Sequence, residues 1–512
     1  MPSNDAHTPP ASDAEDGTVA WTALQRRLRE QGLLEGERVG PEARSPDALR
    51  VEHLTDDSRT AGAGSAFVAI RGTEADGHAF IDAAIAGGAR LVVCETLPDG
   101  ARERFPETVF AQVTDTRAAL AEMAAARYGD PADALSLVGV TGTNGKTTVA
   151  FLVHHLLEAL GTTTGLLSTI EVRTGGDTTD SALTTPGPIE LQRTLRRMVD
   201  GGCTACAMEV SSHALDQKRV HGLDFEVGIF TNLTTDHLDY HGTLRAYRRA
   251  KKKLFDNLSS DAAALYNADD EAGTQMVADT VATPVSYALD HDADVRPEVL
   301  ESRVDGLRLA IEGRERTFRL AGRFNAYNLA AAYGAGRALG YAPTAVLDAL
   351  AAAPPVPGRF EQLTFENGPT IVVDYAHTPD ALEAILRAVR DTAPADATLW
   401  CVFGCGGDRD ASKRPRMGGI AEEGADRVIV TSDNPRTEDP EAIMADIRSG
   451  FRRPDEAQWI VDREAAIEAA AEGADPGDVV LIAGKGHETD QTIGTEKRPF
   501  DDRKIARKYF SC

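Results

Sequence analysis

The stretch GVTGTNGKTT, residues 139–148, is the strongest local signal for the fold of this chain. It follows the apolar run LSLVGV (135–140), which predicts a buried strand. It leads into TTVAFLVHHLLEALG (147–161), which predicts a helix. A strand that turns through glycines into a helix is typical of an α/β domain, so we expect such a domain around this stretch.

The glycines and the lysine of this loop suit phosphate binding. Gly142 and Gly145 let backbone N–H groups approach a phosphate, and the helix N-terminus adds positive potential. Lys146 can reach β- and γ-phosphates, and Thr147 can offer its hydroxyl to Mg²⁺. The spacing is G-x-x-G-x-x-G-K-T, because Val140 stands where the strict phosphate loop has glycine. The alternative is a glycine-rich turn with a chance lysine, but the strand before and the helix after favour a phosphate loop.

Outward from this loop, apolar strands and Ala-rich helical stretches alternate along most of the chain, with breaks at GDPAD (129–133) and AAAPPVPGRFE (351–361). We therefore predict an α/β protein of three domains. They are an N-terminal α/β domain, a central phosphate-loop domain with a mostly parallel sheet, and a C-terminal Rossmann-like domain. The predicted boundaries are a disordered acidic tail at 1–20, then 21–133, 134–353 and 354–512.

Composition excludes several classes of function. With 54 basic and 80 acidic residues the net charge is −26, which disfavours nucleic acid as a partner. The sequence has no apolar run of about 18 residues, so no membrane helix is predicted. The N-terminus lacks the features of a signal peptide, so we expect a cytoplasmic protein. Cys203 and Cys206 have no second pair and no spaced histidines, so we interpret them as core rather than zinc ligands.

Three side chains near the phosphate loop are candidates for metal binding. Glu209 ends the predicted strand ACAMEV, and His237 follows the predicted strand VGIFTNL, so both can hold Mg²⁺ at strand exits. The alternatives are a capping or ion-paired Glu209 and a loop His237 with its hydrogen bonds satisfied. Lys251 lies in YRRAKKKLF, which contains three of the ten lysines of the chain. Such a run is often a solvated helix face, but this clustering favours a functional role.

In the third block, polar stretches follow four predicted strands: DYAHTPDAL (374–382), GCGGDRDASKRPRM (404–417), TSDNPRTEDP (431–440) and GKGHE (484–488). Parallel strands end at one edge of their sheet, so these stretches predict a shared binding site. Arg436 suits a ligand carboxylate because guanidinium is a planar, permanently charged fork. The alternative is a surface ion pair with Glu438 or Asp439.

The ordered motifs resemble those of the Mur ligases, ATP-dependent amide-forming enzymes of peptidoglycan precursor synthesis. The resemblance is carried by TDDSRTAGAGSAFVAIRG, GTNGKTT, LTTPGPIELQ, EVSSHAL, TNLTTDHLDYHG, RAKKKLF, NADD, GRFNAYNLAAA, VPGRFE, DYAHTPDAL, GCGGDRD, KRP, SDNPR, GKGHE and FDDR. It is strongest to the members that add the third residue of the peptide. It implies an enzyme that joins meso-diaminopimelate to the D-glutamate of UDP-N-acetylmuramoyl-L-Ala-D-Glu through an acyl phosphate, with ATP and Mg²⁺. We expect a monomer.

The resemblance also implies roles for individual residues. ATP would be bound by Gly142, Thr143, Asn144, Gly145, Lys146, Thr147, Thr148, Asn328 and Asp374. The catalytic set would be Lys146, Glu209, His237 and Lys251, and Mg²⁺ would be held by Thr147, Glu209, His237 and Lys251, the last as a carbamate. The UDP-substrate would be bound in the N-terminal and central domains by Ser58, Thr184, Thr185, Ser211, Gln217 and Arg219. Diaminopimelate would be bound by Arg409, Asp433, Asn434, Pro435, Arg436, Gly484 and Glu488.

Some alternatives stay open at this stage. Pro186 departs from some relatives and leaves the nearby substrate contacts open. The added amino acid can be L-lysine, or the chain can be another Mur or folylpolyglutamate-type ligase. From a different class, it can be a phosphate-loop ATPase or binding module without ligase activity.

Overall fold

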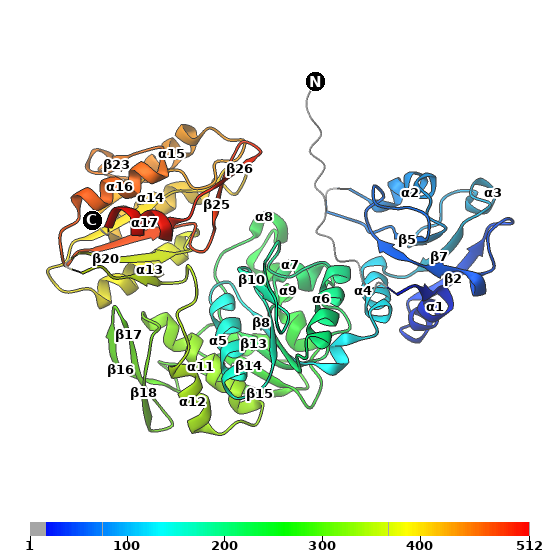
Figure 1. The fold of residues 1–512 in the computed structure, drawn as a ribbon, viewed down its shortest axis with the longest axis horizontal. Helices are drawn as coiled ribbons and strands as arrows, with labels where there is room; N and C mark the ends of the chain where they lie inside the picture. Colours follow the sequence, from blue (N-terminus) through cyan, green and yellow to red (C-terminus); the bar gives the residue numbers. More distant parts are fainter. Residues whose placement is uncertain (1–16, 74, 367, 511–512) are drawn as a thin grey trace. The chain divides into compact units, whose positions relative to one another are not determined.

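The computed structural model describes residues 17–73, 75–366 and 368–510 (Figure 1). It contains two compact units. Unit 1 is the N-terminal part to Leu135 with Pro186–Asp200 and Gln217–Leu223, and unit 2 is the remainder. Of the predicted disordered tail, residues 1–16 lie outside the described residues, whereas Val19–Ala20 form a short strand.

Unit 1 is an α/β fold around a five-stranded sheet of order β2-β7-β6-β5-β4. Neighbours from β7 to β4 run parallel, and β2 is antiparallel at one edge. The elements are β1 Val19–Ala20, α1 Trp21–Glu30, β2 Leu34–Val39, η1 Pro46–Ala48, β3 Arg50–Val51, β4 His53–Thr55, β5 Ser65–Val68, η2 Gly77–Phe80, α2 Ile81–Gly87, β6 Leu91–Cys94, α3 Ala101–Arg104, β7 Val109–Val113, α4 Thr116–Arg127, η3 Pro131–Ala134 and α6 Pro188–Asp200.

Unit 2 begins with an eight-stranded sheet of order β11-β10-β9-β12-β8-β13-β14-β15. All neighbours from β9 to β15 are parallel, and only the hairpin strands β10 and β11 are antiparallel, which confirms the predicted mostly parallel sheet. Its elements are β8 Ser136–Thr141, α5 Lys146–Ala159, β9 Thr164–Leu167, β10 Glu171–Arg173, β11 Thr178–Asp180, β12 Ala205–Glu209, α7 Ser212–Asp216, β13 Phe225–Phe230, α8 Leu238–His241, α9 Leu244–Asp256, β14 Ala263–Asn267, α10 Gly273–Met276 and β15 Thr283–Tyr287.

A small antiparallel sheet and two helices complete this part of unit 2: β16 Glu298–Arg303, β17 Gly306–Ile311, β18 Arg314–Phe318, α11 Arg323–Ala338 and α12 Pro343–Ala351. Helices α5 and α11 lie side by side (Figure 1). Leu152, Leu156 and Leu329 from these helices are buried in one apolar core with the sheet. Each such leucine stabilises the fold by roughly 1.5–3 kcal/mol relative to an exposed one. This packing fixes the helix that begins at the phosphate loop.

The last part of unit 2 is a six-stranded sheet of order β19-β20-β24-β21-β22-β23, parallel except for β19. It confirms the predicted Rossmann-like α/β domain. The elements are β19 Glu361–Leu363, β20 Thr370–Asp374, α13 Pro379–Thr392, β21 Leu399–Phe403, α14 Lys413–Gly424, β22 Arg427–Val430, α15 Pro440–Arg448, η4 Pro454–Glu456, β23 Gln458–Trp459, α16 Arg463–Gly473, β24 Val479–Ala483, β25 Asp490–Ile493, β26 Glu496–Pro499 and α17 Asp502–Phe510.

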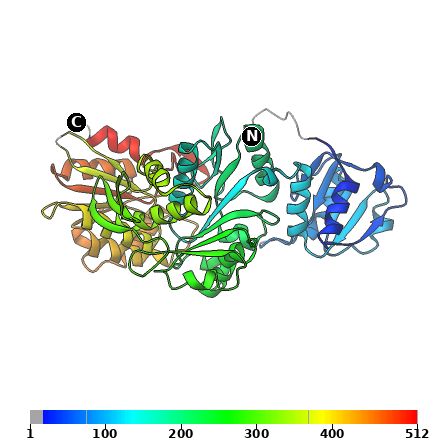
Figure 2. The same cartoon turned by 90° about the horizontal axis from the view of Figure 1, so that it is seen from below.

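Helices cover both faces of this sheet. One apolar core joins the sheet to α13, α14 and α15, and a second joins it to α16 and α17. Helices α16 and α17 lie next to each other in both views (Figures 1 and 2). Because both faces are covered, polar groups can gather only at the strand ends, and the carboxyl ends of β20, β21, β22 and β24 share one edge.

In the described part of the chain, no helix combines the length and the apolar character that crossing a membrane requires.

Candidate active site

The phosphate loop joins β8 to α5, as the sequence predicts. Gly142 has φ +148° and Gly145 has φ +88°, which non-glycine residues rarely adopt. A Cβ at Gly142 would lie 1.9 Å from Thr231 Oγ1, and one at Gly145 would lie 2.6 Å from Asn328 Oδ1. Both glycines are therefore required by the backbone and by their neighbours.

Lys146 is the first residue of α5, and its ammonium folds back over the loop. Nζ donates to the carbonyls of Gly142 (3.0 Å) and Thr143 (2.8 Å). Burial lowers the pKa of Lys146, while Glu209 and Asp236 act in the opposite direction. The cation thus lies where amide N–H groups of a helix N-terminus also point, which is an arrangement suited to phosphate.

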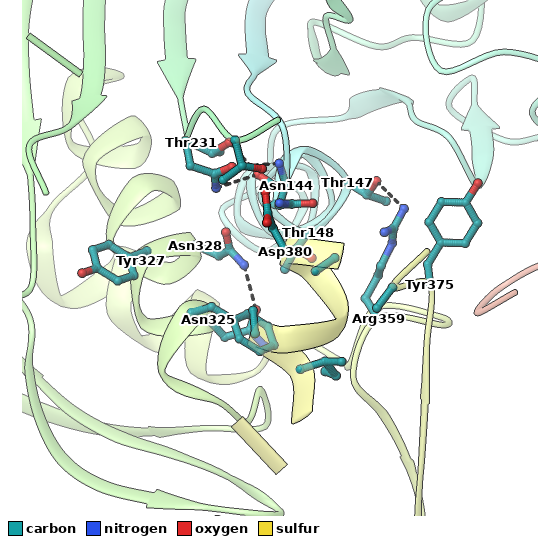
Figure 3. A pocket seen from close by; sticks show the side chains of 18 of the residues that line it. Asn144, Thr147, Thr148, Thr231, Asn325, Tyr327, Asn328, Arg359, Tyr375 and Asp380 are labelled. Atoms are coloured by element: carbon teal, nitrogen blue, oxygen red, sulfur yellow. Dashed lines mark hydrogen bonds between the residues drawn. The ribbon is translucent and has the colours of Figure 1, made fainter. Parts of the chain in front are cut away.

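A cavity of about 400 Å³ opens beside the loop (Figure 3). Asn328 on α11 donates to Asn325 Oδ1 at 2.8 Å, and Arg359 donates to Thr147 Oγ1 at 3.1 Å. The cavity is lined by Asn144, Gly145, Thr147, Thr148, Thr231, Asn232, Thr234, Asn267, Asp269, Asp270, Tyr287, Phe324, Asn325, Tyr327, Asn328, Arg359, Asp374, Tyr375, Ala376, His377, Asp380, Ala381, Ala384 and Ile385. Its size and its mixture of polar and aromatic walls suit a nucleotide.

Asp374, at the end of β20, lies in the wall of the same cavity. Its carboxylate accepts from the backbone N–H groups of Phe360 and Ala376, both at 2.7 Å. Burial raises the pKa of Asp374, and the nearby Arg359 guanidinium opposes that shift. The predicted nucleotide residues Asn328 and Asp374 are thus brought together around one cavity with the phosphate loop.

Glu209 lies at the end of β12 and is buried. Its carboxylate accepts from Thr169 N at 2.7 Å and from Thr169 Oγ1 at 3.2 Å. These contacts hold the carboxylate in place without an ion pair among the described residues. Free lone pairs on a fixed, buried carboxylate suit a hard cation.

Lys251, on α9, is 1% exposed, whereas Lys253 on the same helix is only half-buried and pairs with Asp216. Lys251 Nζ donates to the Gly142 carbonyl at 2.6 Å and lies 4.3 Å from the centre of the Tyr247 ring. Burial lowers the pKa of Lys251 well below its usual value, and the Lys146 cation adds to this effect. The lysine run is therefore not a uniformly solvated face, because one of its members reaches under the phosphate loop.

His237 immediately precedes α8 and has φ +52°. Its Nε2 lies 3.5 Å from Asp236 Oδ2, and its ring meets the edge of the His213 ring at 4.8 Å. Burial lowers the pKa of His237 to about 4, with Asp236 opposing and Lys146 among the groups that lower it further. The imidazole is therefore neutral at pH 7, the form that can bind a metal.

The described residues contain no cluster of three or more His, Cys, Asp and Glu side chains arranged around a metal position. A cation at Glu209 and His237 therefore needs other oxygen ligands. Thr147 can offer a hydroxyl, whereas a Lys251 ammonium, which donates to Gly142 O, has no lone pair for a metal. Hard oxygen donors fit Mg²⁺ at this place, provided that Lys251 carries an acidic modification.

The residues predicted for the nucleotide-sugar substrate fall in both units. Ser58, Gln217 and Arg219 belong to unit 1, where Arg219 Nη2 donates to Gln217 Oε1 at 2.8 Å. The other three belong to unit 2. Thr185 donates to the Glu209 carbonyl and accepts from Ser211 N, whereas Thr184 accepts from Thr169, which also donates to the Glu209 carboxylate.

A second cavity, of about 730 Å³, lies at the carboxyl edge of the C-terminal sheet. Residues from all four of the polar stretches that follow the predicted strands line it. Its walls are formed by Thr235, Asp236, His237, Leu238, Asp239, Tyr375, His377, Thr378, Pro379, Gly406, Arg409, Asp410, Ser412, Lys413, Arg416, Asp433, Asn434, Arg436, Gly484 and Glu488. Because Asp236 and His237 also line it, this cavity adjoins the candidate metal site.

Arg436 lies in a turn after β22, with φ +50°. Its N–H donates to Thr492 O at 3.1 Å, and its carbonyl accepts from Gly494 N at 2.7 Å, so β25 and its turn hold the strained backbone. The guanidinium Nη1 donates to the carbonyls of Gly407 (2.7 Å) and Asn434 (3.4 Å).

The alternative of a surface ion pair for Arg436 is wrong. Glu438 pairs with Arg414 at 2.9 Å, and Asp439 caps α15 by accepting from Glu441 N at 2.9 Å. The guanidinium of Arg436 lines the cavity instead.

The turns that follow β22 and β24 also line this cavity. Asn434 Nδ2 donates to Glu488 Oε2 at 2.8 Å, which joins the DNPR and GKGHE turns across the sheet edge. A Cβ at Gly484 would lie 2.6 Å from Asp433 Oδ2, and that buried oxygen has no hydrogen-bond partner among the described residues. Pro435 is buried and does not line the cavity, whereas Arg409 lines it and is exposed.

Sequence reasoning missed two cations at these cavities. Arg359 lies in the Pro-rich segment predicted to be only a connection, yet it touches Thr147 and lies 4.5 Å over the Tyr375 ring. Lys485 lies in GKGHE between two glycines, with a fully buried side chain. Because lysine is scarce in this chain, the lysine of GKGHE could have been singled out from the sequence.

Comparison with known proteins agrees with this geometry. Residues 50–128 match the Mur ligase family catalytic domain, 140–336 the Mur ligase middle domain, and 358–486 the Mur ligase glutamate ligase domain. The UDP-N-acetylmuramoyl-L-alanyl-D-glutamate–2,6-diaminopimelate ligase of Parabacteroides distasonis is 45% identical over 93% of this chain and 98% of its own length. The chain belongs to the Mur ligase family.

Other relatives agree. The protein of the same name from Cytophaga hutchinsonii is 45% identical over 88% of this Mur ligase and 93% of its own length. A solved structure described as a UDP-N-acetylmuramoyl-L-alanyl-D-glutamate–2,6-diaminopimelate ligase is 34% identical, with a TM-score of 0.64. That comparison covers 91% of this chain and 96% of the solved chain. The three-domain α/β class predicted from the sequence of this Mur ligase is therefore confirmed.

Proposed function

We propose that this Mur ligase joins meso-diaminopimelate to the D-glutamate of UDP-N-acetylmuramoyl-L-Ala-D-Glu at the expense of ATP. One structural observation carries the choice of amino acid. The Arg436 guanidinium, which pairs with neither Glu438 nor Asp439, lines the 730 Å³ cavity together with Glu488. A cation and an anion in one pocket match the distal carboxylate and ammonium of diaminopimelate. The names of the relatives at 45% identity support the same choice.

ATP binding is supported by the loop of residues 142–148 and the adjoining 400 Å³ cavity. In the proposal the amides of Gly142, Thr143, Asn144, Gly145, Thr147 and Thr148, together with Lys146, hold the phosphates, and Asn328 and Asp374 border the nucleoside. Mg²⁺ would be held by Thr147, Glu209, His237 and a carbamate on Lys251. When bound, it offsets phosphate charge during transfer.

The reaction follows from these positions. A carboxylate oxygen of the D-glutamate attacks the γ-phosphorus of ATP, and the bond to the β-phosphate oxygen breaks to release ADP. Lys146 stabilises the charge that develops on the transferring phosphoryl group. The amine of the incoming amino acid then attacks the acyl carbon, loses a proton, and inorganic phosphate leaves. Water must be excluded because it would hydrolyse the acyl phosphate.

In this proposal Arg436 and Asn434 bind the distal carboxylate of diaminopimelate, and Glu488 binds its distal ammonium. Asp433, Pro435 and Gly484 form the turns that bring these groups together, and Arg409 lies at the rim. L-Lysine lacks the distal carboxylate, so binding it would leave the Arg436 cation without its partner.

The UDP-substrate residues remain part of the proposal: Ser58, Thr184, Thr185, Ser211, Gln217 and Arg219. Their support is that Thr185 and Ser211 are hydrogen-bonded beside Glu209, and that Thr184 bonds to Thr169, a partner of the Glu209 carboxylate. We also propose domains at 21–133, 134–353 and 354–512, a monomer, and a cytoplasmic location where ATP and nucleotide sugars occur. The three family matches fall within these domains.

The test is a phosphate-release assay with ATP, Mg²⁺ and UDP-N-acetylmuramoyl-L-Ala-D-Glu, run with meso-diaminopimelate, L-lysine, D-alanyl-D-alanine and no amino acid. We expect release only with meso-diaminopimelate, and a product mass equal to that of the tripeptide nucleotide. Equal rates with L-lysine would contradict the choice of amino acid. Phosphate release that needs no acceptor would favour a simple ATPase.

A further inference from the structure

Lys485 lies behind the wall of the 730 Å³ cavity that we propose binds the amino acid. It follows β24, and its side chain is 0% exposed. Nζ donates to Glu488 Oε2 at 2.7 Å and to Asn434 Oδ1 at 3.2 Å, and both of these partners line the cavity. Taking an ammonium out of water costs several kcal/mol unless anionic and polar partners compensate. The two partners found here are side chains that face the cavity.

The Lys485 ammonium fixes the direction of the Asn434 amide. An ammonium has three donors and no acceptor, so only Oδ1 can face it. Thr492 N donates to the same Oδ1 at 2.9 Å, which gives a second, independent reason for this direction. Nδ2 therefore points to Glu488, to which it donates at 2.8 Å. Reversing the amide would place an NH₂ group against an ammonium and a backbone N–H.

This arrangement leaves Asn434 and Glu488 each with one kind of hydrogen-bonding group for a ligand. Both lone pairs of Asn434 Oδ1 are used by Lys485 and Thr492, so Asn434 can offer only its second N–H to a ligand. Glu488 Oε2 is used by Lys485 and Asn434, so its Oε1 is left as an acceptor. The cavity is thus lined by the Arg436 guanidinium, by one N–H donor of Asn434 and by Glu488 Oε1 as an acceptor, and Lys485 fixes the last two.

We propose that Lys485 is a positioning residue that makes the pocket select one configuration at the distal carbon of diaminopimelate. This inference rests on the proposed function. The distal carbon carries a carboxylate, an ammonium and the chain that leads to the reacting amine. If the donor and acceptor positions are fixed, exchanging the two groups places the carboxylate against Glu488 and the ammonium against Arg436. Like charges then meet at both contacts, so the other stereoisomer is rejected.

Arg463 is also fully buried near this edge of the sheet, but it acts on other atoms. Its guanidinium pairs with Asp502 and donates to the carbonyls of Ser432 (3.2 Å) and Ala483 (3.0 Å). It therefore fixes the backbone at the ends of β22 and β24. Control of the pocket side chains belongs to Lys485.

The test compares wild type, Lys485→Met and a control, Lys504→Met, which replaces an exposed lysine of the same domain. For each, kcat and KM are measured with meso- and LL-diaminopimelate, ATP and the UDP-substrate. For Lys485→Met we expect KM for the preferred isomer to rise by at least about 10-fold, the effect of losing one charged hydrogen bond. The ratio of kcat/KM between the isomers should fall by a similar factor, while KM for ATP stays unchanged. The control should match wild type.

A second variant, Asn434→Asp, keeps an oxygen toward Lys485 and Thr492 but replaces the N–H donor beside Glu488 with an acceptor. We expect it to lose use of the preferred isomer, and a cooperative melting transition measured in parallel shows that it is folded, which decides the matter if Lys485→Met does not fold. An unchanged isomer ratio in folded Lys485→Met overturns the inference alone. Unchanged KM in Asn434→Asp overturns the inference and the assignment of Asn434 to the distal carboxylate, but leaves the ligase activity standing. Wild type that uses neither isomer overturns the proposed function and this inference with it.

Discussion

Replacing Arg436 by alanine removes the guanidinium that we assign to the distal carboxylate of diaminopimelate. Nη1 is already engaged with the carbonyls of Gly407 and Asn434, so Nε and Nη2 remain for one two-pronged contact with a carboxylate. Removing one member of a buried, hydrogen-bonded charge pair costs about 2–5 kcal/mol. Arg436 is only half-buried, so we expect the lower part of this range, about 2–3 kcal/mol. That corresponds to a loss of about 30- to 160-fold in kcat/KM.

The measurement is kcat/KM for meso-diaminopimelate by phosphate release, with KM for ATP recorded in parallel. Arg436→Lys is the matched variant, because it keeps the charge and places a non-glycine residue at the same φ of +50°. Its loss should be smaller than that of Arg436→Ala but real, since an ammonium lacks the planar fork. Arg452→Ala, an exposed site in the same domain, controls for surface charge. The reasoning fails if Arg436→Ala keeps wild-type kcat/KM, or if kcat/KM for L-lysine falls equally.

Three further changes should have distinct effects. Lys146→Ala should lower kcat at least about 100-fold, because the developing phosphoryl charge loses its cation; wild-type turnover would exclude the phosphate-loop assignment. Lys251→Ala should be nearly inactive, and bicarbonate should not rescue it. Intact-mass analysis of active wild type should show a carbamate on Lys251, and a plain amine there would refute the modification. Asp502→Asn should destabilise the fold by about 3–5 kcal/mol, because Arg463 is left buried without its anion. Urea unfolding measures this free energy, with the exposed Asp455→Asn as control. A free energy of unfolding equal to that of wild type would contradict the buried pair.

Local patterns were enough to predict the framework of the site. The phosphate loop could be recognised because glycines, a lysine and the strand–helix context all lie within ten residues of sequence. The polar strand exits could be placed on one edge because parallel strands that alternate with helices must end together. The unusual clustering of lysine predicted a special role for the run that contains Lys251, and that side chain is buried against Gly142 O.

Contacts between distant segments could not be predicted in this way. Arg359 reaches Thr147 from 212 residues away, and although VPGRFE is one of the motifs of the resemblance, no local pattern in it predicts this contact. The hairpin β25–β26 is short and largely polar, so it gives no apolar alternation, yet its Thr492 fixes the amide of Asn434. Such details depend on the packing of the whole domain.

The charge distribution explains why these few cations matter. The chain carries −26, while the proposed substrates, ATP, the nucleotide sugar and the amino acid, all carry carboxylates or phosphates. An acidic surface offers no long-range attraction to such molecules. Affinity must therefore come from single cations held in cavities, where water screens them less than it screens surface charges. Lys146, Arg359 and Arg436 line or border these cavities, and Lys251 and Lys485 are buried directly behind them. In a chain with only ten lysines, this placement concentrates positive charge where bonds are made, which is the arrangement a ligase of anionic substrates requires.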